Sequence, residues 1–307
     1  MMTTVPHNAP STKIYIGRKL EDLLGELRNL PLMPATAQQA MALANEENAS
    51  AKDLSALLER DVALASSILK LANSPVFNWG HAIESLNAAV VRLGLRECQN
   101  LILAVSMRNV FSKTDPATKG LCAVLWQHCF LTATLCRRLS RVFRLNYQGE
   151  EFAAGLLHDL GRILLAITIP DEFQRADPMD FLEDSDIQHR ESQVLGTDHC
   201  QLGNLYAEHN GLPRGIQSVI RFHHQHEDDP DHRELSALVA MADHMANYLQ
   251  RREDPQAYDV NVNPGFAYLC KGWSSEKKDA LTKTLPVIMT ETINAAAHPT
   301  HPKSPRR

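Results

Sequence analysis

The sequence lacks the features that mark several specialised classes of protein. Its six cysteines form no CxxC pair and no short-spaced framework, so a reducing, cytoplasmic setting fits best. Lysine and arginine number 31 against 36 acidic residues, a formal net charge of -5, which gives nucleic acid no broad cationic field to bind. No apolar run approaches the roughly 20 residues of a membrane helix. The polar start of the chain shows no secretory signal.

Strand-like alternation and repeats of fixed period are also missing, whereas apolar residues recur at helical spacing along most of the chain. Cys122, Cys129 and Cys136 recur every seven residues, which places them along one stripe of a helix. Packing in the core explains this stripe better than zinc ligation does. At 307 residues, 44% of them hydrophobic, the chain can bury a real core. The sequence predicts an all-α fold.

Capping and turn residues predict where the helices begin and end. Ser50 and Asp61 are candidate N-caps, and the run Asn73-Ser74-Pro75 should stop the helix that Asp61 begins. Further strongly apolar segments follow, and the last of them should be buried on most sides. The expected helices cover about 20–29, 34–45, 51–60, 61–73, 83–92, 95–111, 121–143 and 150–169.

A short polar stretch divides the chain into two predicted subdomains. Residues 112–119 contain Asp115-Pro116 and lie between two strongly apolar helices, which makes them the best internal boundary. An N-terminal helical subdomain is therefore expected over 18–117, and a second helical subdomain with the C-terminal helices over 118–297. The terminal segments 1–17 and 298–307 lack hydrophobic periodicity and are expected to be disordered tails.

Histidine is abundant, with 14 residues, and several lie within apolar helices, where a buried imidazole needs a partner. Taken singly, each is better explained as a core, helix-end or capping residue. Taken together, their order at helix-sized separations favours one metal centre, because imidazole and carboxylate bind divalent iron, manganese, zinc or nickel. Such a metal can polarise phosphate and activate water. The candidate ligands are His128, His158, Asp159, His199, His223, His224 and Asp243.

This order resembles the HD superfamily of metal-dependent phosphohydrolases, whose His, His-Asp and Asp would correspond to His128, His158, Asp159 and Asp243. A closer resemblance covers roughly residues 23–250 and rests on LPLMP, DVALASSILKLANS and AIESLNAAVVRLG. By these motifs the chain is identified as a member of the HD-related output domain family, HDOD. The resemblance implies an HD-like helical bundle in a bacterial, cytoplasmic signalling protein that contacts another signalling protein.

The resemblance leaves two functions open. Many HDOD proteins have lost parts of the metal motif and are thought to act as regulatory modules, which favours signal transduction. The alternative is an active phosphohydrolase on a phosphoester or nucleotide. In that case His128, His158, Asp159 and Asp243 would hold one ion, and His199, His223 and His224 would complete a second or cap the pocket. Asp159 would orient water or bridge two ions, and the nearby Arg162 would offset phosphate charge.

Cyclic-di-GMP hydrolysis is not predicted. The related HD-GYP phosphodiesterases would show HDxGK and then HHExxDGxGYP, whereas this chain reads HDLGR and HHQHEDDPDH. Arg162 replaces the lysine and keeps its positive charge, although the two side chains differ in geometry. The GYP signature is absent.

Overall fold

A computed structural model describes the chain at residues 23, 25, 27, 35–44, 46, 48–77, 81–111, 118–182 and 187–297. All regular elements in these residues are helices, so the predicted all-α fold is confirmed. The α-helices are α2 (Ala35–Ala44), α3 (Ala51–Leu58), α4 (Val62–Ala72), α5 (Leu86–Leu93), α6 (Leu95–Phe111), α7 (Lys119–Phe143), α8 (Glu150–Leu157), α9 (Leu160–Thr168), α10 (Pro170–Ala176), α11 (Ile187–Leu195), α12 (His199–His209), α13 (Arg214–Phe222), α14 (Arg233–Gln250), α15 (Phe266–Leu269) and α16 (Ser275–Ala297). The predicted end of the first helix, the residues 112–117 and both predicted tails lie outside the described residues.

The predicted caps of the N-terminal helices are confirmed. The Ser50 side chain accepts a hydrogen bond from the amide of Asp53 at the start of α3, and Asp61 accepts one from the amide of Leu64 at the start of α4. Asn73 ends α4, and its side chain bonds both the amide and the carbonyl of Ile83, at 2.7 and 2.8 Å. That pair of bonds ties the end of α4 to the segment that leads into α5.

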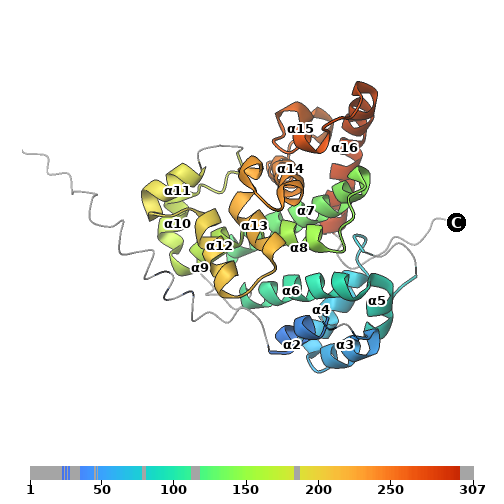
Figure 1. Cartoon of the computed structure of the whole chain (residues 1–307). Coiled ribbons are helices and arrows are strands. Elements are labelled where there is room, and N and C mark those ends of the chain that lie inside the picture. Colours follow the sequence, from blue (N-terminus) through green and yellow to red (C-terminus); the bar gives the residue numbers. More distant parts are fainter. Residues whose placement is uncertain are drawn as a thin grey trace, which may run out of the picture.

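Helix α6 connects two groups of helices. It packs against α2, α4 and α5 on one side and against α8 on the other, and Figure 1 shows α2–α5 beneath it and the remaining helices above it. The second group is built around α7, which packs on α8, α14 and α16. The division of the chain at 117/118 stays a prediction, because residues 112–117 are not described.

The expected continuous helix over 150–169 is wrong in one respect that matters for the site. The chain forms two helices, α8 and α9, and leaves helical geometry at Asp159, with φ -94° and ψ 23°. Adjacent side chains on an unbroken helix diverge by about 100°, so the break allows His158 and Asp159 to face one point. The pattern of apolar residues does not predict the break, because the residues on both sides of it are buried, as expected for this segment.

A buried charge cluster joins α6 to the second group of helices. Arg137 on α7 donates to Glu97 on α6 at 2.9 Å and to Glu151 on α8 at 2.6 Å. Burial raises the pKa of Glu97 from its ordinary value near 4.5 to about 7, even though Arg137 opposes the shift and Glu151 adds to it. One arginine therefore holds two carboxylates, and one of these binds a proton near neutral pH.

Replacing Glu97 by glutamine is expected to change how stability depends on pH. Because the folded pKa lies above the unfolded one, the folded state binds more protons between pH 4.5 and 7. The wild type should therefore lose stability relative to Glu97→Gln as pH rises through this window, by up to about 1.4 kcal/mol per pH unit. Thermal unfolding from pH 5 to 8 measures the difference, with the exposed Glu59→Gln as control. A gap between wild type and Glu97→Gln that stays constant with pH would contradict the assignment.

Candidate metal centre

The fold brings the seven predicted ligands into one region. They come from separate helices and from the turns at their ends, so the centre exists only once α7, α8, α12, α13 and α14 have packed. His128 lies on α7, His158 follows α8, Asp159 precedes α9, His199 begins α12, His223 and His224 follow α13, and Asp243 lies on α14. Six of these side chains are buried, and His224 is exposed.

Asp159 lies between two groups of histidines. Its Oδ2 is 3.6 Å from Nε2 of His128 and 3.6 Å from Nε2 of His158. Its Oδ1 is 3.6 Å from Nε2 of His199 and 3.7 Å from Nε2 of His223. Two ligands of one ion, each about 2.0–2.2 Å from it, lie roughly 3.0–3.5 Å apart, close to these separations. The carboxylate is therefore placed as a bridge, with one oxygen for each group.

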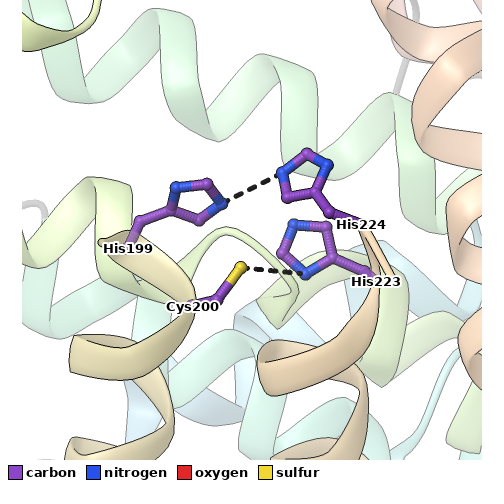
Figure 2. A group of neighbouring side chains, drawn as sticks. All are labelled: His199, Cys200, His223 and His224. Carbon is purple, nitrogen blue, oxygen red and sulfur yellow. Dashed lines mark hydrogen bonds between the residues drawn. The ribbon is translucent and has the colours of Figure 1, made fainter. Parts of the chain in front are cut away.

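Asp243 and His224 complete the two groups. Oδ1 of Asp243 lies 2.9 Å from Nε2 of His128 and 3.4 Å from Nε2 of His158, on the side of Asp159 Oδ2. In the other group, Nε2 of His224 lies 3.2 Å from Nε2 of His199, and Figure 2 shows the two rings pointing at each other.

Cys200 lies behind the second group. Its sulfur is 3.9 Å from Nδ1 of His223 (Figure 2), whereas Nε2 of the same ring is the nitrogen near Asp159. Burial raises the pKa of the Cys200 thiol, which keeps it protonated. All six cysteines of the chain are free and buried, in accord with the core role predicted for the stripe on α7.

Hydrogen bonds on the outer nitrogens set the protonation of two rings. Nδ1 of His158 lies 2.8 Å from the carbonyl of Gly155, and Nδ1 of His223 lies 3.1 Å from the carbonyl of Val219. A carbonyl only accepts, so Nδ1 carries the proton and Nε2 of a neutral ring has a free lone pair. Nε2 of His223 is buried with no hydrogen-bond partner among the described residues. Such inward lone pairs fit a cation.

The two aspartates supply negative charge to this centre. Burial alone would raise the pKa of Asp159, but Arg162 and the surrounding histidines hold it well below its ordinary range. Burial likewise opposes the charge of Asp243, but the His128 and His158 rings beside it outweigh burial, so its pKa is also low. Both carboxylates are therefore ionised at neutral pH and can act as anionic ligands.

Arg162 is committed to carboxylates. Its Nη1 donates to Oδ2 of Asp159 at 2.8 Å, and its Nε and Nη2 both donate to Oδ2 of Asp177, at 2.8 and 2.7 Å. The fork-shaped edge that would suit a phosphate is thus occupied by Asp177. In this geometry Arg162 fixes the orientation of the bridging carboxylate and brings positive charge beside it.

Glu191 is a supporting residue that sequence reasoning missed. This fully buried side chain on α11 accepts from Nδ1 of His199 at 2.6 Å and from the backbone amide of His199 at 2.9 Å. A carboxylate behind a histidine fixes the tautomer and raises the basicity of the inner nitrogen. In the sequence, Glu191 is only an acidic residue eight positions before His199, in a segment of mixed polar and apolar residues. That pattern is too common to mark a supporting residue.

Replacing Glu191 by glutamine should weaken metal binding in the second group alone. Glutamine can still accept a hydrogen bond, but the negative charge behind His199 is lost, and changes of this kind cost about 10–100-fold in affinity. Competition with a chromophoric chelator measures the loss. Glu208→Gln, an exposed change on α12, is the matched control. An unchanged affinity in Glu191→Gln would mean that His199 does not bind metal.

A cavity of about 780 Å³ opens from the centre. It is lined by Asp159, Arg162, His224 and Asp243, by Tyr248 of α14, and by Arg251, which follows that helix. A cavity of this size can admit a small organic phosphate. The candidate ligands are therefore accessible from outside the bundle.

Comparison with known proteins identifies the family. The sequence profile of the HDOD domain matches residues 30–226. The chain belongs to the HDOD family. An uncharacterized protein of Treponema pallidum (strain Nichols) is 25% identical over 223 residues, which cover 72% of this chain and 43% of that protein. The chain thus spans less than half the length of this curated relative.

Solved structures share the fold of this HDOD protein. The crystal structure of an HDOD domain protein of unknown function from Geobacter sulfurreducens has a TM-score of 0.71 and 22% identity, and the match covers 91% of this chain and 95% of that one. A Shewanella amazonensis SB2B protein, named provisionally as a metal-dependent phosphohydrolase, has a TM-score of 0.63 and 18% identity, covering 92% and 98%. The predicted HD-like helical bundle is confirmed.

A further solved relative bears a signalling name. The Marinobacter aquaeolei VT8 protein, named provisionally as a signal transduction protein, has a TM-score of 0.59 and 20% identity, and the match covers 92% of this chain and 66% of that one. Within the described part of this HDOD chain, no helix has the length and apolar character needed to cross a membrane.

Proposed function

We propose that this HDOD protein is a signal-transduction module that holds divalent metal in a complete histidine–aspartate centre. The observation that carries the proposal is the position of Asp159, whose two oxygens each face a separate group of imidazole Nε2 atoms. His128, His158 and Asp243 would hold one ion with Asp159. His199, His223 and His224 would hold a second. Iron, manganese, zinc and nickel all suit this set of nitrogen and oxygen ligands.

A metal would also account for two close contacts between histidine nitrogens. His199 and His224 place Nε2 against Nε2 at 3.2 Å, and His128 and His158 do so at 3.3 Å. Because Nδ1 of His158 and of His199 already donates outward, their neutral rings present lone pairs to these contacts. A cation would satisfy these lone pairs, whereas without one the Nε2 of His128 or of His224 would have to carry the proton of its ring and donate it.

The signalling role draws on the family. In a signalling module, the metal would stabilise the packing of the helices that carry its ligands. Metal that binds only the folded state adds its binding free energy to the free energy of unfolding. The output would be contact with another signalling protein. The name of the Marinobacter relative supports this reading.

Hydrolysis of a phosphoester or nucleotide is a second candidate function, favoured by the cavity that reaches the centre. A divalent metal would supply Lewis-acid polarisation of phosphate and a water acidic enough to react at neutral pH. The chain itself contributes the ionised Asp159 to orient such a water, and Arg162 to hold that carboxylate in place. The positive charge of Arg162 would also offset charge on a phosphate in the cavity.

Elemental analysis of protein purified without chelator tests the metal centre. The wild type should carry divalent metal, and a His158→Ala Asp159→Ala double variant should carry little. Equal metal contents would overturn the proposal. Metal-loaded protein should then be assayed on a panel of phosphoesters and cyclic dinucleotides. Turnover by the wild type that is absent from the double variant supports the hydrolase. A metal-loaded wild type that hydrolyses none of these substrates supports the signalling module instead.

A further inference from the structure

Among the described residues, one histidine that is not a candidate ligand lines the cavity. His244 follows Asp243 on α14, is buried, and lines the same cavity as Asp159 and Arg162. Its Nδ1 lies 2.8 Å from the hydroxyl of Tyr258. Nδ1 is thus hydrogen-bonded to Tyr258, and Nε2 is the nitrogen of His244 that can form a hydrogen bond with a ligand in the cavity.

The hydrogen bonds of Asn263 determine the direction of that contact. The side-chain oxygen of Asn263 accepts from the backbone amides of Gly265 and Phe266, at 3.0 and 3.2 Å, so its orientation is unambiguous. Its nitrogen donates to the carbonyl of Met241 at 3.0 Å and to the hydroxyl of Tyr258 at 2.7 Å. The Tyr258 oxygen thus accepts from Asn263, and its own proton can be donated to Nδ1 of His244.

This arrangement favours one tautomer of His244. When Nδ1 accepts from Tyr258, the neutral imidazole carries its proton on Nε2 and is a hydrogen-bond donor toward the cavity. The Tyr258 ring is held in place, since it lies edge-on against Tyr248 with ring centroids 5.0 Å apart. Gly265 allows the segment carrying Asn263 to approach α14, because a Cβ there would lie 2.1 Å from the carbonyl oxygen of Ala237. The donor is therefore pre-oriented by packing.

We propose that His244 is a positioning residue that donates a hydrogen bond from Nε2 to a phosphoryl oxygen of a ligand bound at the metal centre. This inference rests on the proposed metal centre and adds a ligand contact to it. The role suits His244 because the fork of Arg162, which lines the same cavity, is already taken by Asp177.

Inorganic phosphate and the full-length protein provide the test. Manganese-loaded protein is titrated with phosphate by calorimetry, and metal content is measured on the same samples. His244→Phe should bind phosphate at least about tenfold more weakly with unchanged metal content. His244→Gln should restore binding to within about threefold, because its amide oxygen can accept from Tyr258 while its nitrogen donates to the ligand.

The tautomer gives a readout that a purely structural role would not move. In ¹⁵N-histidine spectra of metal-free protein, the His244 signals, assigned by their loss in His244→Gln, should show the proton on Nε2. Tyr258→Phe should shift the population toward the Nδ1 form and weaken phosphate binding without loss of metal. A wild type protonated on Nδ1 would overturn the inference, as would His244→Phe with wild-type phosphate affinity.

These outcomes separate the inference from the proposed metal centre. A wild type that takes up no metal refutes the centre itself. A wild type that holds metal but binds no phosphate refutes the role of His244 without refuting the metal centre. The same holds if replacing His244 leaves the phosphate affinity unchanged.

Discussion

Replacing Gly161 by alanine is expected to lower the free energy of unfolding by about 3 kcal/mol or more. A Cβ at this position would lie 1.8 Å from the backbone oxygen of His199, so α9 and α12 could no longer cross at their present distance. Gly203 faces the same crossing, where its own Cβ would lie 2.9 Å from the amide nitrogen of Gly161. For a chain of 307 residues the loss corresponds to a drop in Tm of roughly 5 °C or more.

Gly120→Ala is the matched control for this measurement. It places the same added methyl group on a helical glycine with nothing within 4 Å of the new atom, and alanine is the better helix former by up to about 1 kcal/mol. The control should therefore melt at or slightly above the wild-type temperature. If Gly161→Ala melted there too, the close approach of α9 and α12 would not be what holds Asp159 against His199.

Asp159→Asn is expected to weaken metal binding at both positions by about 100-fold or more. The side chain keeps its size, but it loses the negative charge and one of the two oxygens that face the separate histidine groups. Loss of a single outer ligand such as His224 should weaken only one position. Isothermal titration with Mn²⁺ resolves these cases, because the binding stoichiometry reports each position separately.

Asp177→Asn controls for the loss of an Arg162 partner. Asp177 is as buried as Asp159 and accepts from the same guanidinium, yet it contributes no atom to the histidine groups. Its replacement should leave both binding positions occupied. A loss of metal in Asp177→Asn equal to that in Asp159→Asn would show that the buried ion-pair network, rather than a bridging carboxylate, governs metal uptake.

Helix positions followed well from local signals. The caps at Ser50 and Asp61 and the stop at Asn73 depend on hydrogen bonds made within a few residues, so the sequence contains most of what determines them. The break at Asp159 could not be predicted in this way. Apolar residues flank it on both sides, and the turn is imposed by packing of α8 and α9 against different neighbours.

The candidate ligands were visible because histidine is conspicuous inside apolar helices, and the order His, His-Asp, Asp resembles a known family. Their supporting residues were not visible. Glu191 and Tyr258 reach His199 and His244 through contacts between separate elements, and Gly161 matters only because another backbone passes over it. Such roles depend on which helices meet, which local periodicity does not specify.

The most direct test of the metal centre is anomalous diffraction from crystals grown with Mn²⁺. The geometry predicts two peaks, one on each side of the Asp159 carboxylate. The first should lie among Asp159 Oδ2, His128, His158 and Asp243, and the second among Asp159 Oδ1, His199, His223 and His224. Crystals grown at saturating Mn²⁺ that show no anomalous peak beside Asp159 would contradict the account.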